Sequence, residues 1–102
     1  MRAYKDRVDW IGRRIIENFP RCVDILDEKF VDDYIEGTGA SFKPMMFGAH
    51  KCARFNEDLS RMFKDGWLDR SRVSISIGMG FPNWVYSYRL SKIAETYFGV
   101  SP

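Results

Sequence analysis

The spacing of apolar residues changes at Gly66, and this change restricts the folds that are open to the chain. Before it, residues 49–65 carry apolar side chains every three or four positions, which is the period of a helix that buries one face. After it, residues 72–77 and 84–90 alternate apolar with polar side chains, which is the period of a β-strand. Residues 78–83 contain Gly, Pro and Asn, as is typical of a hairpin tip, so the pattern predicts a helix followed by a β-hairpin.

Two more helices are predicted upstream. Residues 4–18 repeat apolar side chains at helical spacing, and Pro20 closes this segment because proline cannot continue a helix. Residues 28–36 form the second helix, with Asp27 as its N-cap and the glycines of 37–39 as its stop. The sequence therefore predicts three helices before the hairpin.

The connections between these elements also carry apolar residues. Residues 22–26 are compatible with one brief strand. Residues 38–48 predict a turn-rich connection with a helical turn at 43–47, and three of its apolar side chains are expected to pack into the core. These side chains are drawn from Ser41, Phe42, Pro44, Met45, Met46 and Phe47. Ser91 is placed to cap a last short helix over residues 92–98.

Composition places the chain among small globular domains. It has 102 residues, of which 45% are hydrophobic, enough to bury one core and too many for a disordered segment. Cys22 and Cys52 lie far apart and outside any C-x-x-C pair, which favours reduced thiols and a cytoplasmic location. The first residues lead into no signal peptide, and no run approaches the ~18 apolar residues that a membrane span needs. One cytoplasmic domain without a membrane segment is therefore expected.

Charge is distributed unevenly along the chain. Residues 1–42 carry seven basic and nine acidic groups, whereas residues 43–102 carry nine basic and five acidic groups. Two stretches, residues 37–56 and 70–94, contain no acidic residue. Such an arrangement indicates either a face that binds a polyanion or an ordinary solvated surface.

The long helix and the returning strand of the hairpin carry two motifs. They are Leu59-x-x-Met62-Phe63-Lys64-x-Gly66-Trp67-Leu68-x-Arg70 and Val85-Tyr86-x-Tyr88-x-Leu90-Ser91. Together they resemble the winged helix-turn-helix superfamily over residues 27–91. The resemblance implies an α+β fold with a three-helix core, a C-terminal two-stranded β-hairpin wing and a short terminal helix. In this single domain, 1–102, the expected parts are an N-terminal helix at 1–20, the helix-turn-helix at 27–66, the wing at 70–91 and the terminal helix at 92–98.

The resemblance implies a sequence-specific double-stranded DNA-binding protein, such as a small transcriptional regulator. In this family the third helix, here residues 49–65, reads the major groove by its N-terminal part, and the wing contacts the flanking backbone or minor groove. The two acid-free stretches coincide with these two elements. Arg54 is expected on a guanine edge and Lys51 on a phosphate, with the acidic helix 28–36 turned away. The candidate DNA-binding residues are Lys43, His50, Lys51, Arg54, Arg70, Arg72, Asn83 and Arg89.

Apolar surface and net charge bear on the partners of the chain. Apolar residues of the first and last helices exceed the needs of a small core, and they predict a homodimer that places two wings on a palindromic site. These residues are Trp10, Ile16, Tyr97 and Phe98. The modest net charge of +2 and the aromatic segment 81–84 instead favour a protein-binding winged-helix adaptor or a viral inhibitor of host machinery.

Catalytic, metal and cofactor sites are not indicated by the sequence. His50 and Cys52 lack the four-ligand spacing of a zinc site, and Cys52 falls on the apolar stripe of its helix. A cysteine nucleophile needs a nearby base and an orienting group, and the only histidine accompanies this core-facing cysteine. No enzyme activity, metal or cofactor is therefore expected.

Overall fold

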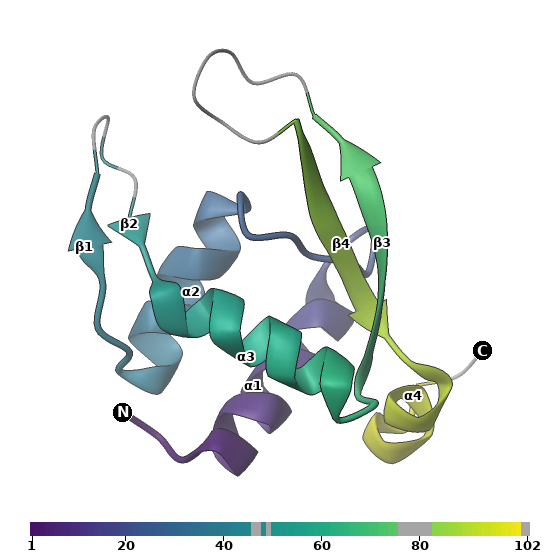
Figure 1. Cartoon of the computed structure of the whole chain (residues 1–102). Coiled ribbons are helices and arrows are strands. Elements are labelled where there is room, and N and C mark those ends of the chain that lie inside the picture. Colours follow the sequence, from purple (N-terminus) through teal and green to yellow (C-terminus); the bar gives the residue numbers. More distant parts are fainter. Residues whose placement is uncertain (46–47, 49, 76–82, 101–102) are drawn as a thin grey trace.

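The computed structural model describes residues 1–45, 48, 50–75 and 83–100 and shows an α+β fold (Figure 1). Its described elements, in chain order, are α1 (Tyr4–Glu17), α2 (Glu28–Thr38), β1 (Lys43–Pro44), β2 (His50–Lys51), α3 (Ala53–Lys64), β3 (Leu68–Ser74), β4 (Trp84–Leu90) and α4 (Lys92–Phe98). The strands form two separate antiparallel ribbons, β1–β2 and β3–β4. None of the helices in these ranges is long and apolar enough to cross a bilayer.

The core lies where α1, α2 and α3 meet. Each helix turns one apolar stripe inward, so that Ile11, Phe30 and Leu59 are fully buried. The ring centroids of Phe30 and Phe55 lie 5.5 Å apart, and those of Tyr34 and Phe55 lie 5.1 Å apart. Burial of side chains of this size stabilises a fold by about 1.5–3 kcal/mol each, which explains why these three stripes determine the architecture.

A glycine turn joins the helices to the wing, the β3–β4 ribbon. Gly66 has a φ of +88°, which glycine adopts without strain, and the chain reverses there after α3. The Trp67 N–H donates to the Met62 carbonyl at 2.8 Å. The Ser91 hydroxyl donates to the Gly66 carbonyl at 2.6 Å. The predicted change from helix to strand at Gly66 is confirmed. β3 begins at Leu68, four residues before the strand predicted at 72–77. Residues 76 and 77 of that predicted strand lie outside the described ranges.

The wing has a regular antiparallel register. It pairs Arg70 with Tyr88 and Arg72 with Tyr86, so these four side chains share one face of the ribbon. Val23 joins the wing as an isolated antiparallel bridge to Tyr88, through backbone hydrogen bonds of 2.9 and 2.8 Å. The brief strand predicted between α1 and α2 is therefore a single bridge residue.

The connection between α2 and α3 differs from the prediction. β1 lies where the sequence predicts a helical turn at 43–47, and it pairs with β2 to form a short ribbon. α3 begins at Ala53 rather than at residue 49, because Cys52 still has extended backbone angles, with φ −124° and ψ 99°. A ribbon therefore replaces the turn that the helix-turn-helix interpretation of residues 27–66 expects.

The apolar side chains of this connection are less buried than predicted. Phe42 is 48% exposed and Met45 is 49% exposed, whereas the small side chain of Ala40 is buried. Met46 and Phe47 lie outside the described residues. The segment has neither a helical nor a strand period, so its sequence does not indicate which side chains face the core.

Both ends of α2 follow the predicted chemistry. The Asp27 carboxylate accepts a hydrogen bond from the Phe30 N–H at 3.1 Å, as an N-cap does. The helix continues through Gly37 and ends at Gly39, whose φ is +74°. A Cβ atom on Gly37 would overlap the Trp10 indole, so this glycine allows the ring to pack against α2.

The residues predicted for a homodimer are mostly used within the chain. Trp10, Ile16 and Phe98 are partly buried against the core, and the Phe98 ring occupies the space beside Gly12. Tyr97, at 54% exposed, is the member of the set that is open to solvent. The homodimer stays a prediction, with less free apolar surface than the sequence indicates.

Candidate functional site

A groove with a volume of about 650 Å³ separates α3 from the wing. Among the side chains that line it are Asn56, Ser60 and Lys64 from α3, Arg70 from β3, and Trp84 and Tyr86 from β4. The α3 side of the groove therefore contributes amide, hydroxyl, carboxylate and cationic groups, and the wing side contributes aromatic rings and a guanidinium.

The apolar stripe of α3 determines which of its side chains reach the groove. Phe55 and Leu59 belong to this stripe and are buried. Asn56, Ser60 and Lys64 follow at four-residue steps, so they form a row beside the stripe along the groove. The helix thus presents an amide, a hydroxyl and an ammonium group in line.

The wing contributes arginines that are held by aromatic rings. The guanidinium carbon of Arg70 lies 3.9 Å from the ring centroid of Phe63 and 4.0 Å from that of Tyr86. The guanidinium carbon of Arg72 lies 4.0 Å from the ring centroid of Trp84. Stacking on a ring face holds the plane of a guanidinium and leaves its N–H edge available to an anion.

The cations in the groove and beside it differ in how far carboxylates neutralise them. Within residues 1–45, 48, 50–75 and 83–100, no carboxylate lies within ion-pair distance of Lys64, Arg70 or Arg72. Glu57 also lines the groove, and its Oε2 lies 3.0 Å from Nη1 of Arg54. The wing side of the groove is therefore positively charged, whereas the start of α3 is internally paired.

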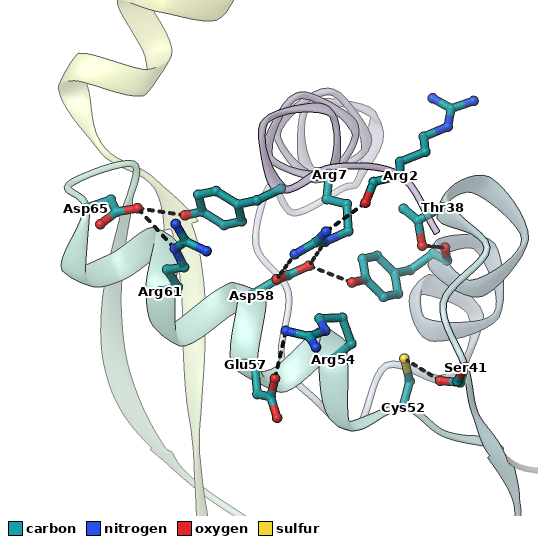
Figure 2. Close-up of polar contacts among 12 residues, drawn as sticks. Arg2, Arg7, Thr38, Ser41, Cys52, Arg54, Glu57, Asp58, Arg61 and Asp65 are labelled. Carbon is teal, nitrogen blue, oxygen red and sulfur yellow. Dashed lines mark hydrogen bonds and ion pairs between the residues drawn. The ribbon is translucent and has the colours of Figure 1, made fainter.

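Arg61 also lines the groove, and its guanidinium is held by Tyr4 of α1 and by Asp65 (Figure 2). Its guanidinium carbon lies 3.6 Å from the Tyr4 ring centroid, and its Nε lies 3.8 Å from Oδ2 of Asp65. The Tyr4 hydroxyl donates to the same carboxylate at 2.8 Å. Burial, together with this hydrogen bond, raises the pKa of Tyr4, so the hydroxyl stays protonated as a donor.

A buried ion pair fixes α3 against the other two helices (Figure 2). Asp58 is 2% exposed and accepts hydrogen bonds from Nε of Arg7 at 2.7 Å and from the Tyr34 hydroxyl at 2.6 Å. Nη1 of Arg7 donates to the Arg2 carbonyl at 2.7 Å. The hydrogen bond to Asp58 raises the pKa of Arg7, and burial raises the pKa of Tyr34. A buried charge needs such complete pairing, so this network sets the position of α3.

The residues predicted at the start of the long helix occupy other places. His50 lies in β2, and its Nδ1 is 2.8 Å from Oδ1 of Asp32 in α2. Asp32 of the acidic helix α2 therefore lies beside a predicted DNA-binding residue. Lys51 lies in β2 opposite Lys43, and Arg54 lies in the first turn of α3 with a carboxylate partner. A stretch without acids in the sequence is therefore not free of acids in space.

The residues predicted on the wing lie on two different faces. Arg70 and Arg72 share the face that borders the groove. Arg89 pairs in register with Asp69, and strand alternation places both on the opposite face. Asn83 is exposed immediately before β4. The wing therefore presents its arginines to two sides of the molecule, and only one of these sides faces α3.

Sequence reasoning missed one side of the groove and the buried pair. The row Asn56, Ser60 and Lys64 could have been found from its four-residue offset beside the apolar stripe. Arg7 and Asp58 each fall inside an apolar stripe, which is a signal that a charged residue has a buried partner.

The described residues offer no cluster of three His, Cys, Asp or Glu side chains that could hold a metal ion. Cys22 and Cys52 are free thiols, and Sγ of the buried Cys52 donates to the Ser41 carbonyl at 3.4 Å.

No protein-family model, curated protein or solved structure matches the chain. The chemistry of the groove is therefore the basis for a functional proposal.

Proposed function

We propose that the chain is a winged-helix protein that binds double-stranded DNA in a sequence-specific manner, with α3 and the wing as its contact elements. The observation that carries the proposal is the convergence of Lys64 and Arg70 on one groove that also contains Asn56 and Ser60. Arg72 lies beside this groove on the same face of the wing and stacks on Trp84, which lines it. Phosphates match the cations, and base edges match the amide and the hydroxyl. Duplex DNA supplies both within one ligand.

The order of elements supports the winged-helix assignment. Three helices precede a β-hairpin, and a residue between the first two helices bridges to the returning strand. The short β1–β2 ribbon stands where the resemblance expects a turn. This ribbon lengthens the link between α2 and α3 and leaves the hairpin directly after α3, as the assignment requires.

α3 is the element that we assign to the major groove, which admits one α-helix. The Asn56 amide suits bidentate bonding to N6 and N7 of adenine, and Ser60 can donate or accept beside it. Lys64 is a point charge that suits a phosphate. Arg54 is paired with Glu57 in the first turn of α3, so this proposal assigns it no base contact.

The wing is the element that we assign to the flanking backbone. Arg70 and Arg72 are held by rings before any ligand arrives, so they lose less side-chain entropy on binding than free arginines would. Binding of this kind would serve a small transcriptional regulator.

A salt titration on a selected duplex tests the proposal. Binders are first selected from a random duplex pool, and affinity for the selected duplex is then measured at several salt concentrations beside a scrambled duplex. Three phosphate contacts predict a slope of log affinity against log salt of roughly −2.7 or steeper. A flat response would remove duplex binding and favour the protein-binding adaptor, and equal affinity for the scrambled duplex would remove sequence specificity.

A further inference from the structure

The β1–β2 ribbon places two lysines directly opposite each other. Its register pairs Lys43 with Lys51, and both side chains are exposed. Like charges at directly opposed positions of an antiparallel pair destabilise it. Among the residues whose positions are described, neither lysine has a carboxylate within ion-pair distance. An anion bound between the two ammonium groups would relieve this repulsion.

A second hollow, smaller than the groove of the wing, lies beside the lysine pair. Its volume is about 340 Å³, and its lining consists of Ser41, Phe42, Lys43, Lys51 and Ala53. This lining contains two cations and no acidic group. The hollow therefore has the charge that a phosphate group would complement.

The ribbon is anchored so that the lysine pair keeps its direction. His50 precedes Lys51 in β2, and strand alternation places the two side chains on opposite faces. The His50 ring contacts Asp32 of α2 at 2.8 Å and lies 4.8 Å from the Phe42 ring between centroids. One face of the ribbon is thus attached to the helices, and the other face presents both lysines.

The two ribbons flank α3. β2 precedes α3 by one residue, and β3 follows it after the Gly66 turn. In Figure 1 the β1–β2 ribbon and the wing both rise above α3, whereas the start of α1 and α4 lie below it. A duplex held by α3 and the wing would therefore extend toward the β1–β2 ribbon on its other flank.

We infer that the β1–β2 ribbon is a second DNA contact, in which Lys43 and Lys51 bind backbone phosphates on the flank of the site opposite to the wing. The inference rests on the proposed function, because it assigns a further part of the same ligand. The ribbon would add phosphate contacts and no base contacts, so we expect a longer footprint on the duplex with an unchanged sequence preference.

The double variant Lys43→Gln/Lys51→Gln tests this inference against the matched double variant Lys5→Gln/Lys92→Gln, which removes the same charge from exposed positions on α1 and α4. Loss of two phosphate contacts should reduce the magnitude of the salt slope by roughly 1.8 and lower affinity about tenfold at moderate salt. The matched control should stay within about twofold of the parent chain, since its charges act only through the general field. Circular dichroism and thermal melting verify that both variants are folded.

Hydroxyl-radical footprinting of the same complexes gives the second measurement. Protection should shorten on one flank in the Lys43→Gln/Lys51→Gln variant and remain complete in the control. If the parent chain binds a duplex with a steep salt slope and both double variants keep that slope and the full footprint, the ribbon contact is wrong and the proposed function stands. If the parent chain binds no duplex, both proposals are overturned.

Discussion

Cations lie near both ends of α3, but they are held differently. Near the N-terminal end, Arg54 has a carboxylate partner at 3.0 Å, and the ring of His50 in β2 contacts a carboxylate at 2.8 Å. Lys43 and Lys51 of the β1–β2 ribbon have no such partner among the described residues. At the C-terminal end, Arg70 and Arg72 stack on aromatic rings at about 4 Å. A carboxylate positions a cation and cancels its charge, whereas an aromatic ring positions it and leaves the charge in place. Arg70 and Arg72 therefore keep a positive charge that Glu57 offsets at Arg54, although both stretches are acid-free in the sequence.

Loss of the buried pair beneath α3 should displace the cations near both ends of this helix, because their positions depend on it. Asp58→Ala leaves the Arg7 guanidinium buried without its carboxylate and the Tyr34 hydroxyl without its acceptor. We expect the free energy of unfolding, measured by urea denaturation, to fall by about 3–5 kcal/mol. The control Asp69→Ala, which removes an exposed carboxylate from the wing, should change it by less than about 0.5 kcal/mol. Similar losses in both variants would show that the buried pair does not hold α3.

Exchange of arginine for lysine separates the effect of ring stacking from the effect of charge at Arg70 and Arg54. Arg70→Lys keeps the charge but loses the planar stack between Phe63 and Tyr86, and it should lower duplex affinity about threefold to tenfold. Arg54→Lys should stay within about twofold, because Glu57 already offsets the charge at this position. Fluorescence anisotropy at low salt measures both. Equal losses in the two variants would mean that ring stacking contributes nothing to the wing contact.

Removal of the Glu57 carboxylate should leave Arg54 with an unpaired charge, as Arg70 and Arg72 have on the wing. Glu57→Gln frees Arg54 and removes a negative charge from the groove lining, so duplex affinity should rise about twofold to threefold at low salt. The increase should disappear at high salt, because charge interactions at exposed positions are screened there. The exposed acid Glu36 on α2 provides the control as Glu36→Gln. A decrease in affinity would indicate that Glu57 itself contacts a base.

Periodicity in the sequence was sufficient to predict the longer helices and the strand β4. The alternation of 84–90 matches β4, and Asp27 and Ser91 cap α2 and α4 as their side-chain chemistry predicts. These features depend on neighbours within a few residues. The β1–β2 ribbon has only two residues in each strand, so it has no period that a sequence pattern could reveal.

The pairing of charges could not be predicted, because it depends on residues that are distant in the sequence. Asp32 meets His50 from 18 residues away, and Asp58 meets Arg7 from 51 residues away. The face on which Arg89 lies follows from alternation, but which face borders α3 follows only from the packing of the wing. The sequence therefore predicted the wing as an element, but not which of its side chains border the groove.

The opposite faces of the wing provide the most direct test of the claim that its inner face holds the DNA backbone. Arg72→Ala removes an arginine from the face that borders the groove, and Arg89→Ala removes one from the outer face of the same ribbon. The measurement is the slope of log affinity against log salt for each variant on the selected duplex. We predict that the magnitude of the slope falls by about 0.9 for Arg72→Ala and is unchanged for Arg89→Ala. Equal slopes for the two variants, or a loss confined to Arg89→Ala, would contradict the account.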